Sequence, residues 1–126
     1  MDKQSESKED KNLTERGVHN PKVIDLIQAE GDSVVLSMIE FRPWNSDPQQ
    51  LEQLQEKFNN YLDYILDGYF LQQYPQYKEI SIIIRLECKE KPSSLEQNLL
   101  EAMQKFVASV PYELSFEWTV KNSCSS

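Results

Sequence analysis

The sequence predicts an α+β fold, a two-layer sandwich in which two helices pack on one face of a four-stranded mixed sheet. Two amphipathic segments with helical spacing, Asp47–Gly68 and Ser93–Val110, give the first indication. Alternating segments precede and follow the second of them, and two β-branched segments joined by a glycine turn precede the first. The resulting order is β-β-α-β-α-β, in which right-handed crossovers would carry the last three strands across the sheet in turn.

Length and charge limit the possible functions. The 126 residues suffice for one domain, which we place at residues 20–121 between disordered tails at 1–19 and 122–126. The net charge of -8 disfavours binding to nucleic acid or to an anionic membrane surface, and it makes a basic protein the natural partner. No apolar run approaches the roughly 20 residues that span a membrane, and the N-terminus lacks the apolar part of a signal peptide. We therefore expect a cytoplasmic protein.

The first two strands are predicted at Lys22–Ala29 and Val34–Phe41, joined by a hairpin turn in which Gly31 can take a positive φ. If Gly31 and Asp32 are the two loop residues, the register follows from the turn. The expected cross-strand pairs are then Ile27 with Leu36, Asp25 with Met38 and Val23 with Glu40. We place these side chains on the sheet face away from the helices. Because both faces of the hairpin are partly apolar, a shift of one residue would exchange the two faces.

The connector Arg42-Pro43-Trp44 leads from the second strand to the first helix. Pro43 cannot donate to a ladder and therefore ends the strand. Trp44 is expected to close the core over the first turn of the helix, near Leu51, because an indole buries much apolar surface. Alternatively, Arg42 and Trp44 belong to a contact surface, since both residue types are enriched in interface hot spots.

The first helix has a readable start, face and end. Asp47 stands at the N-cap, Pro48 follows at the first helical position, and Gly68 supplies a left-handed residue after the last turn. One face gathers the apolar residues Leu51, Leu54, Phe58, Tyr61, Leu62, Ile65, Leu66 and Tyr69. The opposite face gathers Glu56, Asn60, Asp63 and Asp67. This polar face is either an ordinary solvated surface or a contact stripe for a basic partner.

The chain then contains a tyrosine-rich segment, Tyr69–Tyr77, which is too aromatic for a solvated loop. We expect it to pack over one edge of the domain, with a role in lining a ligand pocket as the alternative. The next strand is predicted at Glu79–Cys88. Ser93 and Glu96 form a capping box at the start of the second helix, which ends before Pro111. The last strand follows immediately and ends at Val120.

The sheet face away from the helices is the first candidate for an interaction surface. Its expected mixture of apolar and acidic groups suits a homodimer or a basic partner, although a solvated sheet face would carry similar residues. The candidate interface residues are Arg42, Trp44, Asp25, Met38, Glu40, Ile83, Arg85, Glu87, Glu113 and Glu117. The acidic helix residues Glu56, Asp63 and Asp67 form a second-rank candidate.

Groups suited to catalysis are scarce. His19 is the only histidine, and Cys88 and Cys124 lie outside any zinc-binding spacing. The carboxylate pairs on the helix and the last strand are expected to be exposed, where their pKa values do not suit acid-base work. We therefore expect no catalytic residue, no cofactor and no metal site. The preferred function is a noncatalytic protein-binding module of the inhibitor, immunity or adaptor type. The alternatives are a small-molecule binder or enzyme that uses the tyrosine-rich segment, and a self-associating structural domain.

Several segments together resemble a family of small bacterial proteins of unknown function. These segments are Asn20–Ile27 (NPKVIDLI), Met38–Glu40 with Arg42–Trp44 (MIE and RPW), Leu54–Lys57 (LQEK), Asn60–Leu62 (NYL), Leu66–Gly68 (LDG) and Tyr74-Pro75. The resemblance spans roughly residues 20 to 120, and none of its motifs is chemically specific. It implies a bacterial protein and brings no activity, cofactor or catalytic residue.

Overall fold

The computed structural model describes residues 17–20, 23–44, 47–110 and 113–120. Its elements, in chain order, are β1 (Leu26–Glu30), β2 (Ser33–Glu40), α2 (Pro48–Leu66), α3 (Tyr69–Gln73), the 3-10 helix η1 (Pro75–Tyr77), β3 (Ser81–Cys88), α4 (Ser94–Ala108) and β4 (Leu114–Val120). The predicted α+β order is confirmed, with two short helices added between α2 and β3. Most of the predicted N-terminal tail and all of the C-terminal one lie outside the described residues.

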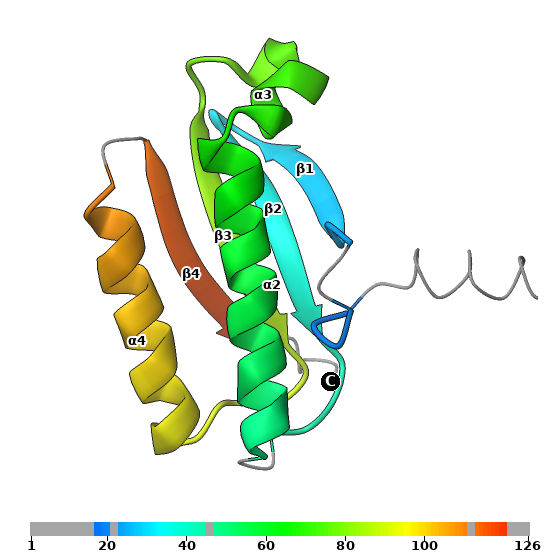
Figure 1. Cartoon of the computed structure of the whole chain (residues 1–126), viewed down its shortest axis with the longest axis vertical. Helices are drawn as coiled ribbons and strands as arrows, with labels where there is room; N and C mark the ends of the chain where they lie inside the picture. Colours follow the sequence, from blue (N-terminus) through cyan, green and yellow to red (C-terminus); the bar gives the residue numbers. More distant parts are fainter. Residues whose placement is uncertain (1–16, 21–22, 45–46, 111–112, 121–126) are drawn as a thin grey trace, which may run out of the picture.

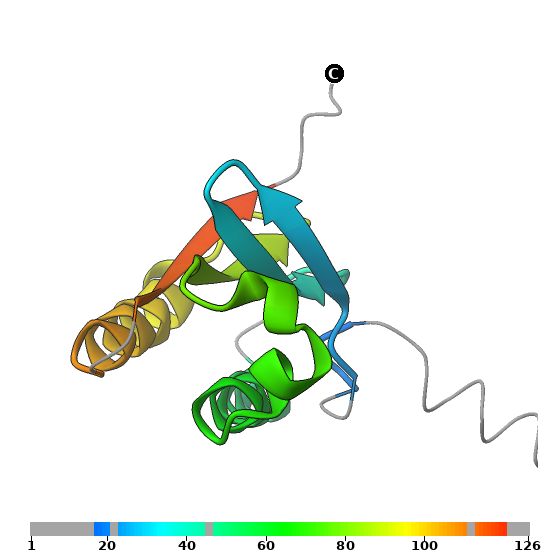
Figure 2. The ribbon, with the colours of Figure 1, turned by 90° about the horizontal axis from the view of Figure 1, so that it is seen from above.

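The sheet has the strand order β1-β2-β3-β4. β1 pairs with β2 in antiparallel orientation, whereas β2, β3 and β4 run parallel to one another. Both long helices, α2 and α4, lie on the same face of this sheet (Figure 1), and the view along the helices shows the two layers (Figure 2). The other face is not covered by any described element. The domain is therefore a two-layer sandwich, as predicted.

The hairpin has the predicted register, but its two faces are exchanged relative to the prediction. Gly31 has a φ of 59°, and Ile27 pairs with Leu36 across the strands. Leu36 in turn pairs with Ile84 of β3, and both side chains are fully buried beneath the helices. Residues of neighbouring strands that stand in register share a face, so the clear alternation of β3 determines which face of β2 is buried.

This exchange moves three candidate interface residues into the interior. Met38 and Glu40 stand in register with Leu86 and Cys88 on the buried side of β3, and Asp25 binds Lys57 of α2. The predicted place of Asp25, Met38 and Glu40 on the open sheet face is therefore wrong. Ile27 and Leu36 move to the helix side with them, and the ladder begins at Leu26, after Val23 and Asp25. The open face of the hairpin instead carries Leu26, Gln28, Val35, Ser37 and Ile39. The hairpin sequence could not decide this, because aliphatic residues occupy both of its faces.

The ends of the long helices follow their sequence signals. The Asp47 carboxylate accepts a hydrogen bond of 3.0 Å from the backbone N–H of Gln49, and Gly68 adopts a φ of 89°. The capping box of Ser93 and Glu96 is present at the start of α4. These local signals therefore fixed both helices at the predicted positions.

The N-terminal boundary of the folded part differs from the prediction. The sequence predicts a tail over residues 1–19, but the side chain of Val18 is fully buried in the core. Its backbone N–H donates a hydrogen bond of 2.8 Å to the carbonyl of Ile39 in β2. The tertiary structure therefore includes Gly17 and Val18.

The tyrosine-rich segment forms α3 and η1 and packs at the end of the molecule where α2 finishes (Figure 1). Phe70 is fully buried, and its ring stacks on Tyr77 with 5.9 Å between ring centroids. Tyr74 lies against the same ring at 5.6 Å. An aromatic cluster therefore holds this segment onto the domain.

Candidate functional site

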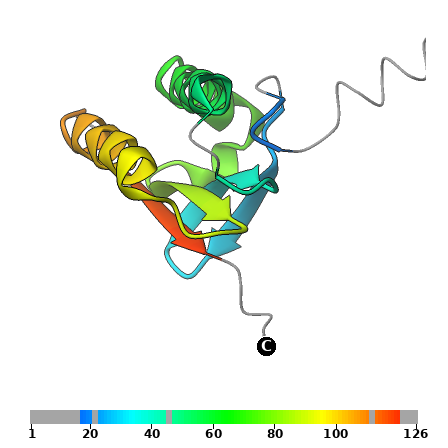
Figure 3. The ribbon, with the colours of Figure 1, turned by 90° about the horizontal axis from the view of Figure 1, so that it is seen from below.

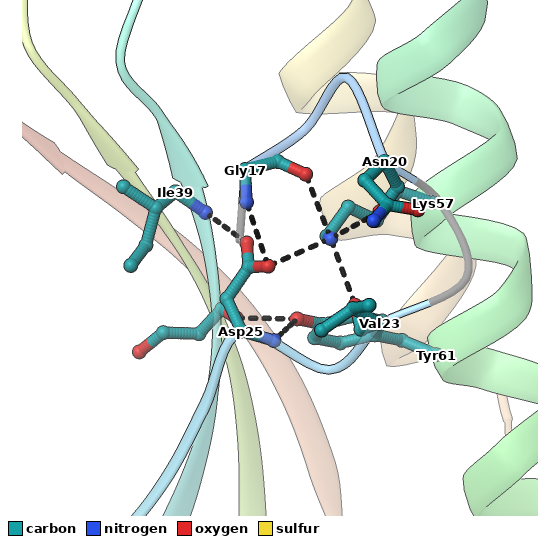
Figure 4. A network of polar contacts seen from close by, with 8 residues as sticks. Gly17, Asn20, Val23, Asp25, Ile39, Lys57 and Tyr61 are labelled. Carbon is teal, nitrogen blue, oxygen red and sulfur yellow. Dashed lines mark hydrogen bonds and ion pairs between the residues drawn. The ribbon is translucent and has the colours of Figure 1, made fainter. Parts of the chain in front are cut away.

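A fully buried ion pair joins Lys57 of α2 to Asp25, which precedes β1 (Figure 4). The Lys57 Nζ lies 2.8 Å from Asp25 Oδ1, and neither side chain is exposed to solvent. Three backbone carbonyls, those of Gly17, Asn20 and Val23, accept hydrogen bonds of 2.7–2.9 Å from the same ammonium group. Burial lowers the pKa of Lys57, and the hydrogen bond and charge of Asp25 oppose that shift.

The second half of this network anchors Asp25 to the sheet. Its carboxylate accepts hydrogen bonds of 2.9 Å from the N–H of Gly17 and 2.8 Å from the N–H of Ile39. The Tyr61 hydroxyl accepts a 2.9 Å hydrogen bond from the N–H of Asp25 and donates to the carbonyl of Ser37. Burial raises the pKa of Tyr61 far above its ordinary value, so the phenol stays protonated. The network joins the N-terminal segment to β2 and α2, and its role is structural.

At the carboxyl end of β2, Glu40 and Arg42 form a bidentate ion pair. Arg42 Nε lies 2.8 Å from Glu40 Oε1, and Arg42 Nη2 lies 2.8 Å from Glu40 Oε2. Trp44 is half-buried against the core, and its indole N–H donates a 2.9 Å hydrogen bond to the carbonyl of Glu90. The predicted contact residues Arg42 and Trp44 thus fix the connector to the strand ends. Arg42 keeps 38% of its side chain exposed.

A hollow of about 280 Å³ lies beside this connector. Its lining residues are Ile39, Glu40, Phe41, Glu87, Cys88 and Lys89. Burial raises the pKa of the Cys88 thiol to about 12, so the nucleophilic thiolate is absent at neutral pH. Glu40 is already engaged by Arg42. The hollow therefore offers apolar contact, chiefly from the exposed ring of Phe41, and no activated nucleophile.

The charged groups of the open sheet face are largely matched with one another. Arg85 of β3 binds Glu30 on β1 through two hydrogen bonds of 2.9 and 3.0 Å, and it binds Glu117 on β4 through its Nε. These two carboxylates raise the pKa of Arg85, so it is a permanent cation. The hydroxyl of Ser37 donates a 3.2 Å hydrogen bond to Glu87. The carboxylate of Glu113 accepts a hydrogen bond from the hydroxyl of Ser81. Four predicted interface residues therefore lie on this face or at its edge, as expected: Arg85, Glu87, Glu113 and Glu117. Ile83 lies among them.

On the outer surface of α2, in contrast to the open sheet face, the exposed carboxylates have no basic side chain beside them on the helix. Lys57 is the one basic residue of this fully described helix, and it is buried. The exposed charged residues of α2 and its two caps are all acidic, namely Asp47, Glu52, Glu56, Asp63 and Asp67. The last four fall within an arc of about 60° at 100° per residue and span about 22 Å along the helix. We call these four residues the acidic stripe. None of them forms an ion pair with another described residue.

Two residues of the acidic stripe, Asp63 and Asp67, are expected to lower the stability of α2. Asp63 and Asp67 lie four residues apart, where like charges repel. They also stand at the C-terminal end of α2, the negative end of the helix dipole, and no basic residue is present in the last turn. These carboxylates therefore have no apparent structural function, unlike Asp25, Glu40 and Glu117.

A hollow of about 480 Å³ adjoins the C-terminal end of the stripe. Its lining residues are Ile24, Asn60, Asp63, Tyr64, Asp67, Tyr69 and Gln73. The ring of Tyr69 is 58% exposed, and burial raises the pKa of Tyr64, which hydrogen-bonds Gln73. Carboxylates beside aromatic rings attract cations. The tyrosine-rich segment thus joins the acidic helix face, two features that the sequence analysis treated separately.

Two of these surface residues were missed by the sequence analysis. Glu52 lies one turn before Glu56, so the spacing that identified the other acids would also have included it. Tyr64 offered no comparable signal, because its hydrogen bond to Gln73 depends on the fold of α3. Phe41 is a further exposed aromatic residue, beside the connector.

The residues that the structure describes offer no evident centre for metal chemistry. Among the residues that it describes, no group of three or more histidine, cysteine, aspartate or glutamate side chains could hold a metal ion. Within the same part of the chain, each helix is too short or too polar to cross a membrane.

The comparisons with known proteins give a family without an assigned activity. No curated protein and no solved structure matches the chain. A family model, described as a family of unknown function, matches residues 16–121, which covers every described element from β1 to β4. This match includes Gly17 and Val18, the residues that join the core ahead of the predicted domain boundary. The chain belongs to this family, DUF6572.

Proposed function

We propose that the protein is a noncatalytic protein-binding module, of the inhibitor, immunity or adaptor type, whose acidic stripe binds a basic partner. One observation carries the proposal: along the whole of α2 and its caps, every exposed charged side chain is a carboxylate. A single-sign surface of this kind attracts a protein of opposite charge and speeds its association.

The distribution of cations supports the same surface. Lys57, Arg42 and Arg85 each form an ion pair within the domain. The acidic stripe has no such internal partner among the described residues, so its charge is available to another molecule. The open sheet face is a weaker candidate for a homodimer or for a basic partner, because Arg85 already neutralises carboxylates on both of its sides.

The state of the reactive groups supports a noncatalytic role. Lys57 is enclosed by its carbonyl shell, and the Cys88 thiol is protonated at neutral pH. The carboxylates of the stripe are solvent-exposed and lack the environment that tunes a catalytic acid or base. The proposal places this binding in the bacterial cytoplasm, in keeping with the resemblance to small bacterial proteins and with the free thiol of Cys88.

The test compares two variants with the same net charge. The stripe variant carries Glu52→Gln, Glu56→Gln, Asp63→Asn and Asp67→Asn, and the control carries Asp32→Asn, Glu79→Gln, Glu90→Gln and Glu101→Gln, which are exposed acids elsewhere. We expect the native chain and the control to bind a basic protein from bacterial lysate at low salt and to release it at about 0.5 M salt. The stripe variant should lose that protein. Equal retention by both variants would contradict the proposal.

A second candidate function is small-molecule binding next to the tyrosine-rich segment. A cavity of about 390 Å³ is lined by Ile65, Leu71, Tyr77, Ile80 and Ile82, with Glu79 and Glu113 among its walls. Apolar walls with a few charged groups are typical of ligand pockets. The expected ligand is a small apolar amine. A thermal-shift screen with such amines would support this function if Leu71→Trp, which fills the cavity, abolishes the stabilisation.

A further inference from the structure

A groove runs between α2 and α4 on the outer side of the helix layer. Seen from below, along the helices, α2 and α4 stand apart over the sheet (Figure 3). The groove is lined by Gln55, Phe58 and Asn59 of α2 and by Leu99, Ala102, Met103 and Phe106 of α4, and its volume is about 210 Å³. The α4 wall is therefore mostly apolar, and the α2 wall combines two amide side chains with Phe58.

The apolar wall continues along almost the whole of α4. Leu95, Leu99, Ala102 and Phe106 recur at steps of four, three and four residues, which places them within an arc of about 60°. Leu95 and Phe106 are 51% and 52% exposed. We call these four residues the apolar stripe. It spans about 16 Å, or three helical turns.

The apolar stripe is not the face by which α4 packs on the sheet. The buried residues of α4 are Glu96, Leu100, Met103 and Val107, which lie about 100° around the helix from the stripe. An amphipathic helix, as predicted for this segment, has one apolar face, and α4 instead has two. One binds the sheet, and the described part of the chain leaves the other half-exposed.

The acidic stripe of α2 forms the rim opposite this apolar wall. Glu52 and Glu56 are exposed and adjoin Gln55 and Asn59 on the helix surface. The groove thus has apolar side chains on its α4 wall and the amides of Gln55 and Asn59 on its α2 wall, and the exposed carboxylates of Glu52 and Glu56 stand next to these amides. The groove is therefore complementary to an amphipathic segment that has apolar residues on one face and lysine or arginine beside them.

We propose that this groove is the docking site for a basic amphipathic helix of the partner protein. The helix places apolar side chains at i, i+3, i+4 and i+7 on Leu95, Leu99 and Phe106, and it directs lysine or arginine toward Glu52 and Glu56. The inference rests on the proposed function and adds the form of the partner's binding segment. Charge selects this occupant over a second copy of the chain, which would bring two acidic stripes and two net charges of -8 together.

The test uses two synthetic leucine-lysine peptides of identical composition, each about 15 residues long. In the first, leucines at helical spacing form one apolar face, and in the second the order is scrambled so that no such face exists. Amide NMR spectra of the full chain follow each titration. We expect the first peptide to bind about tenfold more tightly and to shift the amide signals of α4 around Leu99 and Phe106.

Variants locate the interaction. Leu95→Glu with Phe106→Glu should remove the preference for the amphipathic peptide, because both side chains are half-exposed and belong to the apolar wall. Glu52→Gln with Glu56→Gln leaves every apolar contact in place. It should lower the affinity for the amphipathic peptide and reduce the salt dependence of that binding. Glu101→Gln with Lys105→Gln, on the exposed side of α4, is the matched control and should bind as the native chain does. Circular dichroism checks that each variant is folded.

The outcomes separate this inference from the proposed function. Equal binding of the two peptides, with signal changes confined to the acidic stripe, would contradict the groove as a docking site. The proposal that the acidic stripe binds a basic partner would be unaffected. Failure of both peptides to bind would overturn the groove, and if the native chain also captured no basic protein from lysate at low salt, the proposed function would be overturned with it. Concentration-dependent changes of the α4 signals without peptide, with a dimer in light scattering, would assign the groove to a second copy and overturn the inference.

Discussion

Lys57 of α2 and Asp25 before β1 form an ion pair of 2.8 Å in which neither side chain is exposed. The pair joins two parts of the chain that are 32 residues apart, and three backbone carbonyls share the same ammonium group. Removing one member of a buried pair leaves the other charge without compensation, which costs more than the pair itself contributes.

Lys57→Met should lower the free energy of unfolding by about 3–5 kcal/mol, because the buried Asp25 carboxylate and the three carbonyls lose their shared donor. Urea unfolding monitored by tryptophan fluorescence measures this change. Lys105→Met is the control, since Lys105 is exposed on α4, and it should change the stability by less than about 0.5 kcal/mol. Equal effects of the two substitutions would contradict the buried network.

Cys88 should behave as an inert thiol. Burial raises its pKa from the model-compound value of 9.0 to about 12, so the folded chain keeps a proton that the unfolded chain releases at lower pH. Its contribution to stability is therefore complete below pH 9 and is lost as the pH rises toward about 12. In a Cys124→Ser background, iodoacetamide should label the folded chain at pH 8 far more slowly than the chain in urea.

The pH dependence itself provides an independent check of this thiol. Cys88→Ala should show a shallower loss of stability between pH 9 and 12 than the native chain, whatever its stability at neutral pH. Parallel curves for the two proteins would show that Cys88 ionises normally in the folded state. The comparison cancels the contribution of Tyr61, because both proteins retain it.

Asp63→Asn with Asp67→Asn should separate stability from binding. The two acids repel each other at the negative end of α2, so their neutralisation should leave the stability unchanged or raise it by a few tenths of a kcal/mol, about the size of one helical charge pair. The same double variant should bind basic protein more weakly. Thermal unfolding and binding at low salt measure the two effects, and a loss of stability would show that these acids have a structural partner.

Gly68→Ala should destabilise the domain by about 1–2 kcal/mol, because Gly68 has a φ of 89° between α2 and α3, where a Cβ is strained. No heavy atom stands near the position of an added Cβ, so the cost is one of backbone conformation alone. Gly68→Asn should cost less, since asparagine tolerates the left-handed region better than alanine. Chemical denaturation of both variants tests the order, and a larger loss for Asn would contradict it.

Local signals in the sequence predicted most of the fold. Asp47, Gly68 and the capping box at Ser93 defined the helix ends, and the alternation of β3 defined its buried face. The register of the β1-β2 hairpin followed from its two-residue turn. The predicted face of Asp25, Met38 and Glu40 was wrong: they were expected on the open face and lie on the helix side. The sequence of the hairpin could not show this, because the neighbouring strand β3 determines which face is buried.

The candidate surfaces were predicted less well than the fold. The spacing of the acidic residues predicted the acidic face of α2. That Asp63 and Asp67 line a hollow together with Tyr69 could not be predicted in this way, because it depends on the position of α3. The sequence does carry a signal for the buried role of Lys57. Lys57 lies three residues after Leu54 and four before Tyr61, in the middle of the apolar face of α2, where a charged residue requires a buried partner.

The carbonyl shell of Lys57 makes the N-terminal segment tolerant to changes of sequence but intolerant to changes of length. Backbone carbonyls of residues 17, 20 and 23 supply three of the four acceptors, so the side chains at positions 20 and 23 could vary without removing them. An inserted or deleted residue between Gly17 and Asp25 would displace the carbonyls from the ammonium group. Proteins of this family that keep a lysine at this helix position should therefore keep the spacing of the segment even where its residues differ.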